Sequence, residues 1–172
     1  MEFSELIRRR ESVRNYDPAK PVPRDVILKI LEAGRLAPSA ANKQPWKFVA
    51  LTSPDALKKI HQAYNKTWFH DAPCVLAVTG NRKNAWVRGT DGYCSIETDL
   101  AIAMTHIVLA AANEGVGSCW IANFNSAIVR EALQLTDDEV VYALTPLGFP
   151  GSDYQPKNIK ERKPLDDIVQ WL

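Results

Sequence analysis

The stretch Ile96–Asn113, which reads IETDLAIAMTHIVLAAAN, decides how the rest of the chain can fold. Small or apolar residues occupy nearly every face of a helix built from it, whereas a helix at a protein surface keeps one face polar. Gly115 follows shortly after and would end the helix, because glycine readily adopts the left-handed backbone found at many helix ends. We therefore predict a buried central helix over residues 96–113, around which the other elements pack.

Helices and strands alternate before this central helix. Apolar spacing predicts a short N-terminal helix and a second helix over residues 23–37, which Pro38 stops. Residues 46–51 (WKFVAL) and 74–79 (CVLAVT) have the composition of strands. Between these strands, the sequence predicts a helix over residues 54–66, since serine followed by proline is a common helix start.

The alternation continues after the central helix. Residues 118–122 (SCWIA) and 140–147 (VVYALTPL) are predicted to be strands, separated by a helix that Asn125 or Ser126 caps. By itself, this alternation favours a parallel, doubly wound sheet. Residues 151–172 are polar and rich in proline at first but apolar at their end. We expect this last segment to wrap over another surface, such as a partner subunit.

Length and composition narrow the class of protein. A chain of 172 residues suits one domain, which we expect to span residues 1–172. The 21 basic and 20 acidic residues give a formal net charge of +1, so no overall field attracts nucleic acid or a membrane surface. Three cysteines without C-x-x-C spacing favour free thiols in a reducing compartment. With a charged N-terminus and no long apolar run, these features favour a cytoplasmic protein.

The sequence contains no recognisable reaction centre made of side chains alone. The three histidines do not have metal-ligand spacing, and no nucleophile elbow or glycine-rich nucleotide motif is present. His106 lies in the apolar central helix and is better explained as a core histidine, while Cys74 and Cys119 suit buried strand positions. If the protein is an enzyme, we expect a bound cofactor to supply the reactivity and no side chain or metal ion to act as the catalyst.

Two clusters of basic residues could bind a phosphorylated cofactor. A phosphate group has a charge of about −1.5 to −2 near neutral pH, and arginine can give it paired hydrogen bonds. Taken alone, such clusters are more often solvated surface than phosphate sites. Arg10, Ser12 and Arg14 alternate, however, so in an extended segment all three side chains would point the same way. The second cluster consists of Lys157, Lys160, Arg162 and Lys163.

Four segments, in order along the chain, resemble the FMN-dependent nitroreductase family. They are RESVRNYD (10–17), APSAANKQPW (37–46), GVGSCWIANF (115–124), and LGFP (147–150) followed by KERKPL (160–165). The resemblance implies an α+β fold, a three-layer α/β/α sandwich with a mixed central sheet surrounded by helices. It also implies a homodimer with FMN at the subunit interface and a C-terminal segment that extends onto the partner. We therefore expect this sandwich in place of the parallel, doubly wound sheet that the alternation favours.

The resemblance also implies which residues contact the flavin. The phosphate group and the nearby pyrimidine edge would meet Arg10, Ser12, Arg14, Lys160 and Arg162. Contacts from the other subunit would come from Pro38, Ser39, Asn42 and Gln44. The pyrimidine edge and the ring would also meet Asn65, Trp120, Ile121, Ala122 and Asn123. The backbone N–H of Ala122 is the candidate contact to the reactive N5 edge.

Some positions depart from the family pattern. Glu11 stands where relatives more often have a neutral or basic residue, and we expect its carboxylate to turn outward because a phosphate would repel it. Asn123 stands where relatives often have glycine, and Ala40 replaces a serine. The span 80–93 is short, which predicts a comparatively open substrate pocket. Trp68, Phe69 and Trp86 are candidates for that pocket, although core or interface packing explains them equally well.

The function implied by the resemblance is a ping-pong oxidoreductase. NADH or NADPH would reduce FMN, and a nitroaromatic, a quinone or a related electron acceptor would then take its place. One alternative is a specialised flavoenzyme on the same scaffold, such as a dehalogenase, a flavin-consuming enzyme or a dehydrogenase. Another is a non-catalytic protein that binds flavin or nucleic acid. We expect neither nucleic acid nor a membrane to be a partner.

Overall fold

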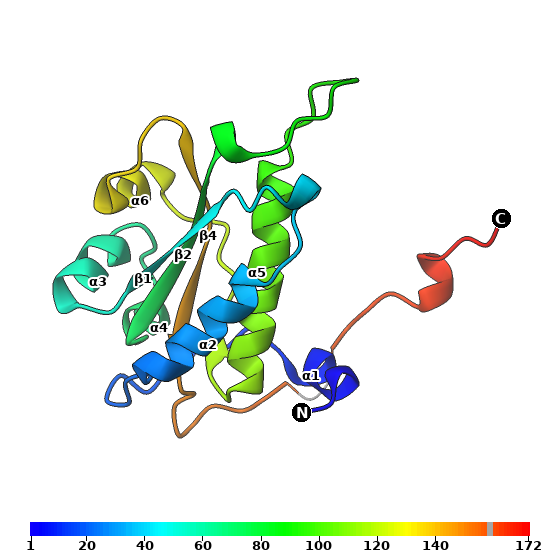
Figure 1. The fold of residues 1–172 in the computed structure, drawn as a ribbon. Coiled ribbons are helices and arrows are strands. Elements are labelled where there is room, and N and C mark those ends of the chain that lie inside the picture. Colours follow the sequence, from blue (N-terminus) through cyan, green and yellow to red (C-terminus); the bar gives the residue numbers. More distant parts are fainter. Residues whose placement is uncertain (158–159) are drawn as a thin grey trace.

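A four-stranded sheet forms the middle layer of the protein (Figure 1). The computed structural model describes residues 1–157 and 160–172. The strands are β1 (Trp46–Leu51), β2 (Cys74–Asn81), β3 (Gly117–Ser118) and β4 (Glu139–Gly148), and they lie in the order β1-β2-β4-β3. Each neighbouring pair is antiparallel, so the parallel sheet favoured by alternation alone is wrong.

The α+β class and the three layers implied by the family resemblance are confirmed. Within the described residues, the parallel component of the sheet is a single bridge between Ser12 and Ser118, outside the named strands. At the centre of the sheet, Val78 of β2 pairs with Phe48 of β1 on one side and with Ala143 of β4 on the other.

Strand β2 is buried because helices cover both faces of the sheet. Its residues from Cys74 to Gly80 are all buried, as expected for a strand without a solvent-facing side. Successive side chains point to opposite faces. Leu76 and Val78 therefore enter one core cluster, whereas Val75 and Ala77 enter the other.

Two groups of helices form the outer layers (Figure 1). Helices α2 (Arg24–Arg35) and α5 (Ile96–Asn113) cover one face of the sheet. Helices α3 (Pro54–His61), α4 (Thr67–His70) and α6 (Ser126–Leu133) cover the other. Helix α1 (Phe3–Arg9) lies near the end of α5, and short 3₁₀ turns occupy Ala40–Asn42, Arg82–Asn84 and Leu165–Asp167.

The predicted central helix is confirmed at the bounds read from the sequence. Leu100, Met104 and Ile107 of α5 are fully buried against the sheet and α2. The helix ends before Gly115, whose φ of 72° is the left-handed conformation that glycine adopts at low cost. On the side of α5 away from the sheet, Ile102 and Leu109 are only half-buried.

Two predicted elements are shorter than the sequence indicated. The helix expected over 54–66 ends at His61, where the amides of Ala63 and Tyr64 donate to carbonyls only three residues back, at 3.0 and 3.2 Å. The carbonyl of Ala63 then accepts from the distant amide of Asn125 at 2.9 Å. Of the strand expected over 118–122, only the first residue belongs to β3. Further along, Ile121 forms a separate bridge with Leu144. Asn125 is the cap of α6, with its Oδ1 accepting from two backbone amides at 3.1 and 3.3 Å.

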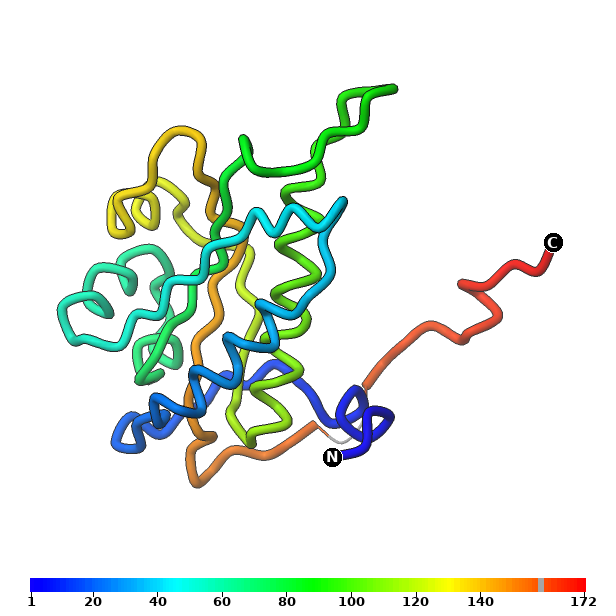
Figure 2. The backbone as a smooth tube through the Cα atoms, viewed as in Figure 1, coloured from blue at the N-terminus to red at the C-terminus, as the bar shows by residue number. Residues whose placement is uncertain are grey.

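The C-terminal arm, residues 160–172, leaves the body of the protein (Figure 2). Its apolar side chains are exposed, most of all Trp171 at 90% and Leu172 at 112%. Within the chain described by the structure, no helix has the length and apolar character needed to cross a membrane.

Candidate functional site

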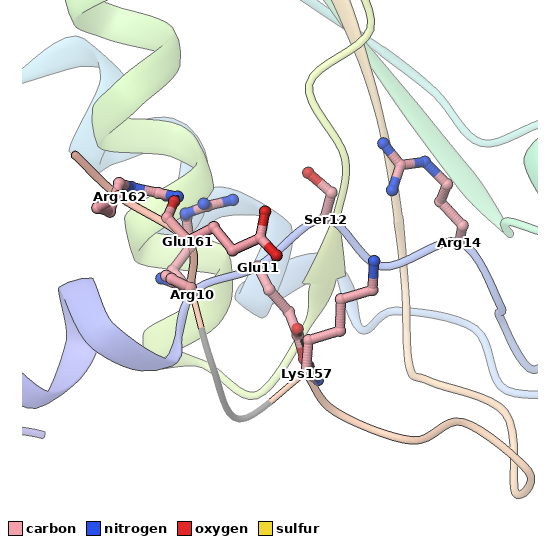
Figure 3. Close-up of a pocket in the computed structure, with 8 residues that line it drawn as sticks. Arg10, Glu11, Ser12, Arg14, Lys157, Glu161 and Arg162 are labelled. Atoms are coloured by element: carbon pink, nitrogen blue, oxygen red, sulfur yellow. Dashed lines mark hydrogen bonds between the residues drawn. The ribbon is translucent and has the colours of Figure 1, made fainter.

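A cleft lined by basic side chains separates residues 10–14, which follow α1, from the C-terminal segment at residues 157 and 160–162 (Figure 3). It encloses about 450 Å³ and is lined by Arg10, Glu11, Ser12, Arg14, Lys157, Lys160, Glu161 and Arg162. The two basic clusters found in the sequence, which are far apart along the chain, therefore meet in one place. We call this the basic cleft.

The alternation of Arg10, Ser12 and Arg14 places them along one wall of the basic cleft (Figure 3). The segment is extended because Ser12 bridges Ser118, and the amide of Val13 donates to the carbonyl of Ser118 at 2.9 Å. Val13 lies between the arginines in sequence and is 6% exposed, so its side chain faces the core. The structure thus bears out the predicted same-side arrangement.

The basic cleft has more positive than negative charge, since five cationic side chains and the two carboxylates of Glu11 and Glu161 line it. Within the described residues, no carboxylate oxygen comes within 4.0 Å of the charged nitrogens of Arg10, Arg14, Lys160 or Arg162. The Nζ of Lys160 instead donates to the carbonyl of Ile7 at the end of α1, at 2.7 Å. Burial and the neighbouring Arg10 and Arg162 lower the pKa of Lys160. An anion in the cleft would relieve this repulsion.

The sequence suggested that the carboxylate of Glu11 turns outward into solvent, away from the basic cleft. The structure shows that it does not. Its side chain is turned toward the C-terminal segment. There Oε1 accepts from the hydroxyl of Tyr154 at 2.7 Å, and Oε2 accepts from the backbone amide of Lys157 at 2.9 Å. The carboxylate is therefore fixed in place at the cleft wall rather than left free.

Arg14 also contacts the layer that contains α4. Its guanidinium carbon lies 5.9 Å from the centre of the Trp68 ring, a separation at which the ring face attracts a cation. Asn65 is exposed in the turn that leads into α4. Trp68 is half-buried against Tyr16, and Phe69 is fully buried, so the packing explanation is correct for Phe69.

The segment after β3 runs from the basic cleft along β4. Trp120 is half-buried, with its ring 5.9 Å from that of Tyr142. Ile121 is buried, and its amide is already used in a hydrogen bond to the carbonyl of Leu144 at 2.9 Å. Ala122 and Asn123 are exposed, and no hydrogen bond of the described residues uses either backbone N–H. Both amides are therefore available to a ligand, as proposed for Ala122.

Cys119 lies behind this wall. Its side chain is buried, and burial raises the pKa of its thiol. The positive charge of nearby Arg14 offsets part of this rise. A protonated, buried thiol agrees with a packing role rather than a nucleophilic one.

Residues 37–46 form a rigid loop anchored near the start of α5. Asp99, which is 1% exposed, accepts from the amide of Ala40 at 2.8 Å and from the hydroxyl of Ser95 at 2.7 Å. The Oγ of Ser39 accepts from the amide of Gln44 at 2.9 Å. The φ angles of Ala41, Asn42 and Gln44 are 49°, 53° and 47°. Such left-handed residues persist only where their surroundings hold them, and they often mark ligand sites.

The loop and the basic cleft lie at opposite ends of α5. The loop is held at Asp99, whereas α1 and the start of the basic cleft lie against Ala112 and Gly115. With a rise of about 1.5 Å per residue, these ends of the helix are about 20 Å apart. One chain therefore brings Arg10, Ser12, Arg14, Lys160 and Arg162 together beside residues 118–123. It does not bring Pro38, Ser39, Asn42 and Gln44 to them.

A nitroreductase family model matches residues 7–68 and 55–149, which contain the loop and the first wall of the basic cleft. The chain belongs to the nitroreductase family. A relative from Archaeoglobus fulgidus with the provisional name NADH dehydrogenase/NAD(P)H nitroreductase is 31% identical and aligns with 87% of this chain and 86% of its own. Iodotyrosine deiodinase 1 of Rattus norvegicus is 26% identical over 98% of this chain and 68% of the deiodinase.

Solved structures show the same fold. A nitroreductase family protein from Clostridium difficile is 30% identical, with a TM-score of 0.92 over 99% of this chain and 98% of its own. A nitroreductase-fold protein from Exiguobacterium sibiricum, solved in complex with FMN, has a TM-score of 0.85 at 22% identity, covering 100% of this chain and 98% of its own. At 22% identity, the likeness to the Exiguobacterium sibiricum protein shows a shared fold alone.

Two residues that shape the candidate site were not found from the sequence. Asp99 could have been noticed as an acidic residue inside an otherwise apolar helix, since buried carboxylates require hydrogen-bond partners. Tyr154 had no such signature, because its partner Glu11 lies 143 positions earlier. Burial, followed by its hydrogen bond to Glu11, raises the pKa of Tyr154 and keeps its hydroxyl protonated as a donor.

Proposed function

We propose that the protein is an FMN-dependent NAD(P)H oxidoreductase that acts as a homodimer. The proposal rests chiefly on the basic cleft, where cations from two segments outnumber the carboxylates around a space large enough for a phosphate group. The donor set fits such a group, because guanidinium, ammonium and hydroxyl groups all donate to phosphate oxygens. The relative named as an NAD(P)H nitroreductase and the neighbour that binds FMN support the choice of ligand.

The chain's own residues would bind and orient the cofactor. Arg10, Ser12 and Arg14 would bind the phosphate from the segment after α1, and Lys160 and Arg162 from the C-terminal segment. The unused amide of Ala122 would donate to the edge of the ring. Bound FMN would supply hydride transfer between NAD(P)H and an electron acceptor. The proposed cycle is ping-pong: NAD(P)H gives its hydride and leaves as NAD(P)⁺ before a nitroaromatic, a quinone or a related acceptor enters.

The separation of loop and basic cleft supports the homodimer. Because the two lie about 20 Å apart along α5, Pro38, Ser39, Asn42 and Gln44 would reach a flavin only in the basic cleft of a second chain. The loop is suited to such a contact, since most of it is exposed and its backbone is held by Asp99.

The C-terminal arm supports the same assembly. Its exposed apolar side chains would be covered in a dimer, and isolated apolar segments of this kind often mark interfaces. The free edge of β1 provides a place for the arm of a second copy, because an edge strand has unpaired backbone groups. Two apolar hollows of about 460 and 260 Å³ lie between this strand and α2, lined in part by Leu28, Leu31 and Phe48.

Anaerobic titration of the purified protein with NADH and NADPH would test the reaction. We expect a yellow protein whose flavin absorbance is bleached by at least one of the two and restored by an acceptor. A colourless protein with salt-sensitive affinity for nucleic acid would instead support the non-catalytic alternative. The deiodinase relative favours including halogenated aromatic compounds in the acceptor panel, and halide release would support a dehalogenase.

Deletion of residues 164–172 would test the homodimer. We expect the shortened chain to lose both the dimer, measured by light scattering, and its flavin. A monomer that retains FMN tightly would refute the shared site.

We also infer a cytoplasmic location and a single domain over residues 1–172. The location is supported by the free thiols of Cys74, Cys94 and Cys119, and fractionation would test it.

A further inference from the structure

Glu11 is a carboxylate in the wall of a cleft proposed to bind phosphate. Like charges repel, so a carboxylate at this position weakens the binding of any anion nearby unless it has another role. Both of its oxygens are used by the C-terminal segment, one by the hydroxyl of Tyr154 (2.7 Å) and one by the amide of Lys157 (2.9 Å). These bonds suggest what the compensating role is.

Further contacts fasten the same two segments together. Asn15 Nδ2 donates to Asp153 Oδ1 at 2.9 Å, and Tyr16 forms a bridge with Pro150. The ring of Tyr154 packs against the small core cluster that contains Val13 and Tyr16. Residues 150–157 are thus laid along residues 11–17, and the bonds to Glu11 lie at the end of this contact nearest the basic cleft.

The position of Lys157 limits where Lys160 can lie. Three residues of extended chain span about 11 Å at most, so a fixed amide at Lys157 keeps Lys160 near the cleft. Lys160 itself is held by the carbonyl of Ile7. Figure 3 shows Arg162 on the same side of the cleft as Arg10, which comes from the other segment.

We propose that Glu11 is a positioning residue of the phosphate site. By binding Tyr154 and Lys157, its carboxylate fastens the C-terminal segment and holds Lys160 and Arg162 beside Arg10. The gain from bringing these cations to the phosphate exceeds the repulsion that the carboxylate itself exerts. This inference rests on the proposed FMN site, and it assigns to Glu11 a role that its charge alone would contradict.

Positioning and repulsion predict opposite results for Glu11→Gln. If repulsion dominates, removing the charge tightens FMN binding. If positioning dominates, binding weakens, because glutamine keeps one acceptor oxygen in place of two and both hydrogen bonds lose the strength that the negative charge gives them. Tyr154→Phe removes one of the same bonds without changing the charge of the cleft. Glu161→Gln is the matched control, since Glu161 also lines the cleft but makes no side-chain hydrogen bond among the described residues.

Flavin affinities of the full-length variants, measured by fluorescence titration, would separate these cases. For Glu11→Gln and Tyr154→Phe, we expect FMN binding to weaken by about three- to tenfold, which is less than the full worth of a hydrogen bond to a charged group because the contacts of Asn15 and Tyr16 still hold the segment in part. Riboflavin, which lacks the phosphate, should change by less than about twofold in the same variants, since a phosphate-specific role leaves ring contacts intact. Glu161→Gln should bind FMN as tightly as the unaltered protein or more tightly.

Amide hydrogen exchange in the absence of flavin gives a readout that does not depend on the cofactor. In Glu11→Gln and Tyr154→Phe, peptides covering residues 150–157 should exchange faster, while those of α5 stay unchanged. Tighter FMN binding by Glu11→Gln, an equal loss of riboflavin and FMN, or unchanged exchange at residues 150–157 would each overturn the positioning role. Failure of the unaltered protein to bind FMN would instead refute the proposed function, and the exchange result would still decide whether Glu11 fastens the segment.

Discussion

Asp99 is the buried carboxylate that ties the loop of residues 37–46 to α5, so its replacement tests whether that loop needs an anchor. Asp99→Ala removes the acceptors of two hydrogen bonds, from the amide of Ala40 (2.8 Å) and from the hydroxyl of Ser95 (2.7 Å). Ser95 is 2% exposed, so its donor would be left without water as a ready substitute.

The expected loss of stability in Asp99→Ala follows from the two hydrogen bonds and from the desolvation cost of the carboxylate, which opposes them. A hydrogen bond to a charged group is worth about 1.5–3 kcal/mol, whereas removing a buried carboxylate also removes its desolvation cost. We expect a net loss of about 3 kcal/mol in the free energy of unfolding for Asp99→Ala. For a chain of this size, that corresponds to a fall in Tm of about 6–12 °C. Asp99→Asn should cost about 1 kcal/mol, because its amide oxygen can still accept and its NH₂ can donate to the serine hydroxyl.

Thermal unfolding followed by circular dichroism, at fixed protein concentration and with excess FMN, would measure these effects. Glu97→Ala is the control, since this carboxylate lies in the same turn of α5 but its side chain is 70% exposed and 3.8 Å from Arg82. It should change stability by less than about 0.5 kcal/mol. Asp99→Ala should also release flavin more readily, because the loop loses its support. A loss below about 1 kcal/mol, or equal losses for the alanine and asparagine variants, would refute the anchoring argument.

Three further predictions concern the basic cleft and the core. Arg14→Ala should weaken FMN binding by about tenfold to a hundredfold, and Arg14→Lys by less, in a flavin titration; unchanged affinity would remove Arg14 from the site. Gly80→Ala should cost about 1–3 kcal/mol, since a Cβ would lie 2.7 Å from the carbonyl oxygen of Pro45. Gly89→Ala, with nothing within 4 Å of its Cβ, is the control, and equal melting temperatures would contradict the steric argument. Burial and the neighbouring arginines lower the pKa of Lys160 from 10.5, so its charge is lost earlier than usual as pH rises. FMN affinity should therefore fall at alkaline pH in the unaltered protein and less in Lys160→Arg; identical pH profiles would exclude this lysine.

The central helix and the wall formed by Arg10, Ser12 and Arg14 were predictable because each depends on residues close together in sequence. Apolar side chains on all faces predict a buried helix wherever they occur. Alternate residues of an extended segment share a side whatever the segment pairs with. The family resemblance added the fold class and the flavin, neither of which follows from such local patterns.

The direction of the sheet did not follow from alternation. A strand covered on both faces, such as β2, is apolar throughout whether its neighbours run parallel or antiparallel, so its composition cannot distinguish them. The sequence also could not show that the chain turns after α3 and bonds at Ala63 to the amide of Asn125, because these residues are 62 positions apart.

The sequence by itself determined the helix over residues 96–113 and the chemistry of its basic clusters, and its resemblance to the family predicted which residues would meet a flavin. Only the tertiary structure decided that Lys160 and Arg162 lie beside Arg10, and that the loop at residues 37–46 lies at the far end of α5. It also decided what Glu11 binds. The physical reason is distance along the chain: backbone propensity and side-chain periodicity act over a few residues, whereas these contacts depend on the path of the whole chain around its core.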